Sequence, residues 1–264
     1  MTPTAPKRRI LRLSGKDTHD FLQGLVTNDV GKVENGLVYA AILTPQGKYL
    51  ADFFLLANGN DILMDTDAAQ TDALVQRLTM YKLRADVHIA LTDLHVHRGL
   101  SDLPKDGYID PRTSDLGWRA YRSDEATDTD VDWSALQVQH IVPASGIELT
   151  PDTFILEAGF ERLNGVDFRK GCYVGQEVTA RMKHKTELRK GLAQVKITGA
   201  AESGTPISAN DKAVGTLLSR AGDVAIAYLR FDRATGPMQA GEATVTWDGQ
   251  NLAILPPSKR KRPS

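Results

Sequence analysis

The chain has 264 residues, of which 41% are hydrophobic and 25% are charged. This composition excludes intrinsic disorder, collagen and a coiled coil, and the length suggests about two domains. The 32 Lys and Arg residues nearly balance the 33 Asp and Glu residues, so the net charge of -1 gives no general electrostatic case for binding nucleic acid. The sole cysteine, Cys172, excludes an intrachain disulfide and any site in which one chain supplies four cysteines to zinc or to an iron-sulfur cluster.

Hydrophobic spacing in the first hundred residues predicts alternating strands and helices. The sequence of the turn Thr44-Pro45-Gln46-Gly47 suits a tight hairpin, because proline and glycine adopt the backbone angles of such turns. In chain order we predict a strand over 10–13, a helix capped by Asp17, strands over 37–43 and 49–56, a helix over 68–81 and a strand over 87–96.

The second half of the chain changes character. Residues 98–132 have poor periodicity, and a helix is predicted around residues 153–163. Four short extended runs separated by glycine-bearing turns then predict a small all-β module at the carboxyl end. These runs are 191–197, 213–219, 224–229 and 243–247, and a basic tail follows at 258–264.

The segment from Asp167 to Lys190 is locally basic, with seven Lys and Arg residues and only three acidic residues. It contains the sequence Lys170-Gly171-Cys172-Tyr173-Val174-Gly175-Gln176-Glu177. Two glycines allow the backbone to turn sharply on either side of the cysteine, and a neighbouring cation together with a following helix would favour the thiolate. The residues alone leave two interpretations open, a reactive thiol or a small buried hydrophobic residue.

This eight-residue sequence resembles the signature of the YgfZ family of folate-binding proteins. That family assists iron-sulfur cluster assembly and is related to the aminomethyltransferase (T protein) of the glycine cleavage system. Further resemblances cover most of the chain. They are Phe21–Gly24 with Thr27–Asp29, the hairpin from Leu43 to Phe53, Asp110–Arg112 with Leu116, Gly117 and Arg119, and the run from Ala213 to Leu229.

The resemblance implies an α+β fold of two lobes and a carboxyl-terminal β-barrel around a central hole that receives tetrahydrofolate. The expected domains are a folate-binding region over 1–188 and a barrel over 189–257. Within the first, one lobe would take about 1–45 with 120–188 and the other about 46–119.

The resemblance also implies the site residues. Cys172 and Lys170 would carry the chemistry. Glu157, in the run Leu156-Glu157-Ala158-Gly159, would hold the pterin ring, because a carboxylate can accept two hydrogen bonds from its amino-pyrimidinone edge. The remaining expected folate contacts are Asp52, Asn28, Tyr173, Gln176, Glu177 and Arg181.

Two positions depart from the related aminomethyltransferases. Ile155 stands where a proline or an arginine is usual, and the pair Ala51-Asp52 replaces two adjacent aspartates of which one is catalytic. Loss of a carboxylate weakens the case for aminomethyl transfer. His95 and His97 share a strand face, but no third ligand is near them in the sequence, so we assign no metal site.

The resemblance therefore favours a tetrahydrofolate-binding accessory protein for iron-sulfur cluster assembly or repair, and the alternative is a folate-dependent aminomethyltransferase. Expected partners are folate and iron-sulfur assembly proteins or client enzymes, and we expect neither nucleic acid nor a membrane. With no signal peptide or membrane span in the pattern, the expected location is the cytoplasm.

Overall fold

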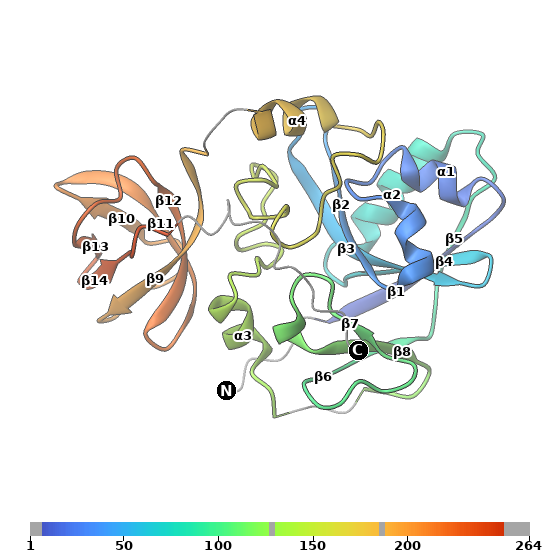
Figure 1. Ribbon diagram of the computed structural model, residues 1–264, viewed down its shortest axis with the longest axis horizontal. Coiled ribbons are helices and arrows are strands. Elements are labelled where there is room, and N and C mark those ends of the chain that lie inside the picture. Colours follow the sequence, from blue (N-terminus) through green and yellow to red (C-terminus); the bar gives the residue numbers. More distant parts are fainter. Residues whose placement is uncertain (1–6, 127–129, 185–187, 251–264) are drawn as a thin grey trace.

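The computed structural model describes residues 7–126, 130–184 and 188–250, which form a five-stranded sheet with its helices, a three-stranded sheet and a closed barrel (Figure 1). The expected tail at 258–264 lies outside the described residues. Among the described helices, none is long and apolar enough to span a bilayer.

The five-stranded sheet is antiparallel throughout and contains the strands nearest the amino terminus. The predicted strands at 10–13, 37–43 and 49–56 are confirmed, and the expected lobe boundary near residue 46 falls inside this sheet. In spatial order the strands are β2 (Val38–Leu43), β3 (Tyr49–Asn58), β4 (Asp61–Asp67), β1 (Arg8–Ser14) and β5 (His88–Leu91).

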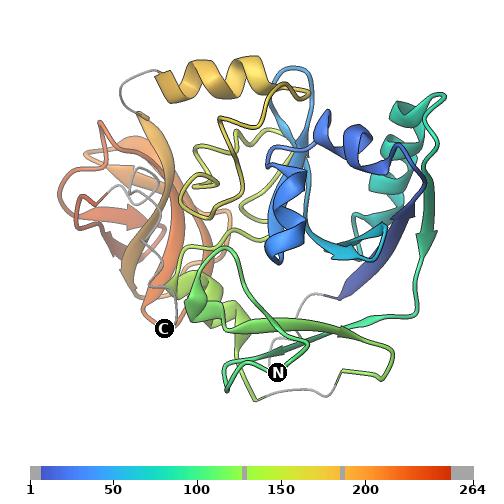
Figure 2. The ribbon, with the colours of Figure 1, turned by 45° about the vertical axis from the view of Figure 1, so that its right-hand side comes forward.

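Helices α1 (Thr18–Gln23) and α2 (Thr71–Lys82) pack on one face of this sheet (Figure 2). Their buried side chains meet alternate residues of β1 to β4, as the period of two in a strand requires. Asp17 is the N-cap residue of α1, as predicted, but its side chain does not cap the helix. Its carboxylate accepts a hydrogen bond from the backbone N–H of Asp86 at 2.8 Å and makes no cap bond to α1.

The opposite face of the sheet is covered by an irregular segment of the chain over residues 141–173, and helix α3 (Trp133–Gln139) packs against the carboxyl-terminal barrel. Phe160 stacks on Tyr39 of β2 with ring centroids 5.1 Å apart. The predicted helix over 153–163 is wrong, since this stretch forms consecutive turns. Gly159 has φ +77°, and the Phe160 N–H donates to the Ile155 carbonyl five residues back, so a regular α-helical ladder does not form.

A three-stranded sheet lies below the larger one in Figure 1. The predicted single strand over 87–96 is two strands, one in each sheet, because Thr92 turns the chain by bonding the Ile10 carbonyl through both its N–H and its hydroxyl. The smaller sheet has the order β6 (His95–Gly99), β8 (Trp118–Arg122), β7 (Tyr108–Ile109).

The carboxyl-terminal barrel follows helix α4 (Gln176–His184), which lies across the top of the molecule between barrel and sheet (Figures 1 and 2). All four predicted strands are confirmed, and two short strands were not predicted. The barrel order is β10 (Pro206–Ala209), β11 (Lys212–Ala221), β12 (Val224–Arg230), β9 (Lys190–Thr198), β14 (Ala243–Thr246) and β13 (Met238–Ala240).

Candidate functional site

The loop that carries Cys172 is held in shape by its two glycines. Gly171 and Gly175 have φ values of +94° and +83°, a region that side chains other than glycine rarely adopt. A Cβ on Gly175 would lie 2.6 Å from the Thr44 carbonyl oxygen, so the loop packs directly on the hairpin turn. Cys172 itself is exposed. The structure therefore excludes a small buried hydrophobic residue, and the reactivity of this thiol stays a prediction.

Lys170 is turned inward from the same loop. Its ammonium donates to the carbonyl oxygens of Gln23 at 2.5 Å and Val26 at 2.7 Å, at the carboxyl end of α1. Burial lowers the pKa of Lys170 to about 8, against a smaller opposing effect of the Asp29 carboxylate. A cation at a helix carboxyl end satisfies carbonyls that have no partner within the helix. In this structure Lys170 joins the cysteine loop to α1.

Helix α4 begins at Gln176, directly after the loop. The Gln176 side-chain amide donates to the Gly171 carbonyl at 2.9 Å and so closes the loop on itself. Glu177 and Arg181 are exposed on the outer side of the helix. These predicted folate contacts thus lie on the surface near Cys172.

Tyr173 points in the opposite direction from Cys172, into the core behind the sheet. Its hydroxyl is buried and has no hydrogen-bond partner among the described residues. Burial raises the pKa of Tyr173 to about 12. Its ring lies 4.9 Å from the Lys170 ammonium, which makes it part of the support of the loop.

Asp52 is buried on β3 beneath a group of hydroxyls. Its Oδ1 accepts from the hydroxyls of Tyr49 at 2.6 Å and Ser145 at 2.8 Å, and its Oδ2 accepts from the hydroxyl of Tyr39 at 3.0 Å. Burial, and then the Asp52 charge, raise the pKa values of both tyrosines. Three hydroxyl donors thus occupy this carboxylate, which disfavours a role as a folate contact or a general base.

The side-chain amide of Asn28 likewise makes all its hydrogen bonds within the protein. Its side-chain amide donates to the carbonyl oxygens of Tyr39 at 2.8 Å and Asn164 at 2.7 Å. Its side-chain oxygen accepts from the Lys32 ammonium at 2.9 Å and from the Asp29 N–H, also at 2.9 Å. The four hydrogen bonds fill the capacity of an amide, so Asn28 has a structural role.

Glu157 lies on the boundary with the barrel. Its Oε2 accepts from the Tyr228 hydroxyl at 2.7 Å, and its Oε1 lies 3.8 Å from the Lys190 ammonium. Burial, and next the Glu157 carboxylate, raise the pKa of Tyr228. Of the two predicted buried carboxylate contacts, Glu157 and Asp52, Glu157 keeps an oxygen without a hydrogen bond to another described residue, whereas both oxygens of Asp52 accept one.

The motif of Asp110, Arg112 and Arg119 forms a buried network of ion pairs between the two sheets. Asp110 accepts from Arg112 Nη2 at 2.8 Å and from Arg119 Nε at 3.1 Å. Arg119 also pairs with Asp65 on β4 at 3.0 Å, and Arg8 pairs with Asp65 at 2.6 Å. Burial opposes ionisation of Asp110, but the charges of Arg112 and Arg119 lower its pKa to about 2.

The predicted residues therefore occupy separate places. The cysteine loop and α4 form one surface, Asp52 and Asn28 lie in the core, and Glu157 lies against the barrel. Two cavities among the described residues, one of about 10 Å³ beside Arg112 and Arg119 and one of about 370 Å³ beside Leu11 and Thr71, are lined by none of these predicted residues. Sequence reasoning missed Tyr39, Tyr49, Ser145 and Tyr228, and the contacts of Ser145 and Tyr228 join segments that are distant in the sequence.

Comparison with known proteins agrees with this architecture. Residues 189–251 match a family model described as the CAF17, C-terminal beta-barrel domain. The fold is similar to the glycine cleavage system aminomethyltransferase T of Bartonella henselae, with a TM-score of 0.71 over 90% of this chain and 81% of that chain, at 12% identity. The aminomethyltransferase-like fold with a carboxyl-terminal barrel is thus confirmed.

Sequence relatives are more specific. One relative is the iron-sulfur cluster assembly factor IBA57, mitochondrial, of Mus musculus, which is 30% identical. The match includes 88% of this chain and 78% of the mouse protein. The corresponding homolog of Mycosarcoma maydis is 32% identical, with 70% of this chain matching 54% of that protein. Both are named as mitochondrial proteins, and this finding overturns the expected cytoplasmic location. The relatives bear the name IBA57 and not YgfZ, and by its likeness to them this chain belongs to the iron-sulfur cluster assembly factor IBA57 family.

Proposed function

We propose that this protein acts in iron-sulfur cluster assembly and that the Cys172 thiolate transiently binds an iron of the cluster. The observation that carries the proposal is the exposure of Cys172 on a loop that is fixed from both sides. Membership of the IBA57 family supports it, because the relatives are named as iron-sulfur cluster assembly factors.

The geometry suits transient contact with a cluster. A fixed loop presents the thiol to a second protein without ordering the chain at the moment of contact, which lowers the entropic cost of binding. One thiol supplies one ligand, whereas protein-bound clusters take four. The chain has no second cysteine, so the other ligands must come from a partner or from a small thiol.

Replacement of Cys172 by serine tests this role. Because the side chain is exposed, Cys172→Ser should leave stability unchanged and reduce the activity of cluster-dependent enzymes in a deletion strain to the level without the protein. His184→Gln, at the far end of α4, is the matched control and should restore activity fully. Full restoration by a stable, equally abundant Cys172→Ser protein would remove the thiol from the mechanism.

We propose tetrahydrofolate as a ligand only at Glu157, which retains accepting capacity on Oε1. Asp52 and Asn28 do not fit the ligand as they stand, because their polar atoms are bound by the protein. We therefore assign no chemical step to folate. The enclosed Asp52 also speaks against aminomethyl transfer, the alternative function.

Calorimetric titration with tetrahydrofolate separates the two parts of the proposal. We expect Glu157→Gln to weaken binding by about tenfold, since a charged hydrogen bond is worth roughly 1.5 kcal/mol or more. Glu161→Gln, in the same irregular segment, should bind like the wild type. If the wild-type protein takes up no tetrahydrofolate, the ligand is lost from the proposal while the role of Cys172 stands.

A further inference from the structure

The buried network between the two sheets has more positive than negative charge. Arg8, Arg112 and Arg119 surround the ring of Phe54, with guanidinium carbons 5.7, 4.8 and 4.0 Å from its centroid. The acceptors in direct contact with these cations are the carboxylates of Asp65 and Asp110. Each of these three arginines thus forms an ion pair, and both carboxylates are already engaged in these pairs.

Arg98 is a fourth cation beside this network. Among the described residues, no carboxylate lies within ion-pair distance of its guanidinium. The guanidinium instead lies over the ring of Trp133, 4.6 Å from the centroid. Burial, and next the charges of Arg119 and Arg8, lower the pKa of Arg98 to about 9. Arg98 thus adds a positive charge beside Arg119 in a poorly hydrated place, where the carboxylate of Asp65 offsets the repulsion only in part.

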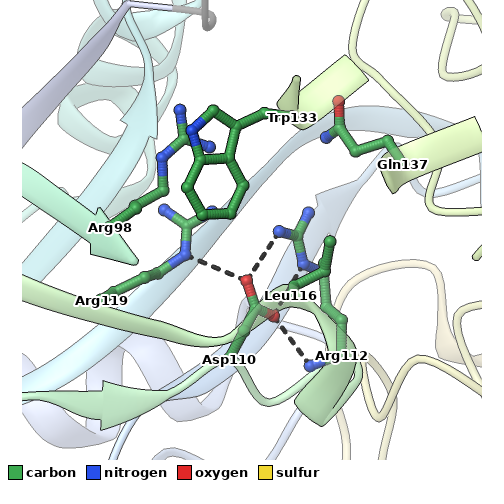
Figure 3. A pocket seen from close by; sticks show the side chains of 7 residues that line it. All are labelled: Arg98, Asp110, Arg112, Leu116, Arg119, Trp133 and Gln137. Atoms are coloured by element: carbon green, nitrogen blue, oxygen red, sulfur yellow. Dashed lines mark hydrogen bonds and ion pairs between the residues drawn. The ribbon is translucent and has the colours of Figure 1, made fainter. Parts of the chain in front are cut away.

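Arg98 and Arg119 both line a small cavity, whose lining side chains are drawn in Figure 3. Its volume is about 10 Å³, close to the room that one water-sized particle needs. Six of its lining residues are polar or aromatic: Arg98, Asp110, Arg112, Arg119, Trp133 and Gln137. Asp110 has its oxygens bound by Arg112 and Arg119, so the lining presents mainly N–H donors.

We propose that this cavity binds one small monovalent anion of about the size of chloride, held by Arg98 and Arg119. The bound anion would offset the repulsion between the two guanidinium groups and would join the β6–β8–β7 sheet to α3, which carries Trp133 and Gln137. This site is separate from the cysteine loop and does not depend on the proposed function.

Thermal unfolding in sodium chloride and in sodium gluconate at equal ionic strength tests the site. We expect a saturable rise of about 2–4 °C with chloride, because a ligand at about ten times its Kd stabilises the folded state by roughly 1.4 kcal/mol. Arg98→Gln should abolish the rise. Arg122→Gln is the matched control on β8, since Arg122 pairs with Asp106 at the surface. An equal rise in Arg98→Gln, or a rise that never saturates, would overturn the proposal.

Crystals of the wild-type protein grown in sodium bromide provide a test that needs no variant. The expected result is an anomalous-scattering peak for bromide between Arg98 and Arg119. Density for a water molecule without anomalous signal in that position would disprove anion binding.

Discussion

Lys170 lies beside an exposed thiol, but its side chain binds backbone carbonyl oxygens and does not point toward the thiol. Its ammonium lies on the carbonyls of Gln23 and Val26 and not toward the surface where Cys172 is exposed. The Gln23 side chain also returns to the loop, because its amide donates to the Lys170 carbonyl at 3.1 Å. The loop and α1 are thus joined by bonds in both directions.

From this arrangement we expect Lys170→Met to destabilise the protein by about 1–3 kcal/mol, since two buried carbonyls lose a charged donor. Lys183→Met is the control, because the ion pair of Lys183 with Glu161 lies at the surface, where such pairs contribute little. Urea unfolding measures both. Unchanged stability of Lys170→Met, combined with lost cluster assembly, would instead make Lys170 a functional residue.

At the residue scale, the sequence identifies which side chains could do chemistry, but not where they point in the fold or what they contact. Local motifs were enough to predict roles for Cys172 and Glu157, and these roles stay predictions. The sequence does not reveal that Asp52 is enclosed, because the donors Tyr39 and Ser145 lie 13 and 93 residues away in sequence. Whether a carboxylate is free or bound depends on pairing across the fold, which no local pattern encodes.

At the scale of elements, α4 and the hairpin between β2 and β3 fit together through two glycines. A Cβ on Gly47 would lie 2.9 Å from the Val178 Cβ of α4, and Gly175 touches the Thr44 carbonyl from the other side. Because the two segments approach so closely, the position of α4 is fixed relative to the large sheet. This contact therefore also fixes the position of the cysteine loop.

We expect Gly175→Ala to cost about 2–4 kcal/mol of stability, from backbone strain at positive φ together with the clash against Thr44. Gly171→Ala has the same kind of strain but no atom within 4 Å of the added methyl, so it should cost only about 1–2 kcal/mol. The difference in urea midpoint isolates the packing contact. Equal losses would mean that strain alone acts at both positions.

Long amphipathic or alternating elements were predictable, and short or irregular ones were not. The strands β2 and β3 and the helix α2 follow their periodic patterns closely. The stretch 153–163 has helix-like spacing but forms turns, because Gly159 takes a positive φ and the segment packs around Phe160. Strands β10 and β13 have four and three residues, too few for a period of two to be visible.

At the scale of the whole molecule, the barrel is attached to the rest through buried carboxylates. Glu148 accepts from the Ser219 N–H at 3.0 Å, beside the register shift in β11, and Glu157 accepts from Tyr228 of β12. The Glu157 carbonyl also accepts from the Leu192 N–H at 2.8 Å. The overall architecture could be predicted because motifs that resemble one family lie along most of the chain. The junction between the barrel and the rest could not, because it depends on contacts between residues that are distant in the sequence.

The position of β1 has a consequence for how the protein folds. This strand is near the amino terminus, yet it lies inside the large sheet, between β4 and β5. In the register of the sheet, Arg8 lies opposite Asp67 of β4 and Leu11 lies opposite Leu91 of β5. The backbone hydrogen bonds of β1 can therefore form only with residues far along the chain. Such non-local pairing slows folding. During synthesis on the ribosome, the large sheet can therefore close only after β5 has emerged, and until then the apolar side chains of β1 need protection from aggregation.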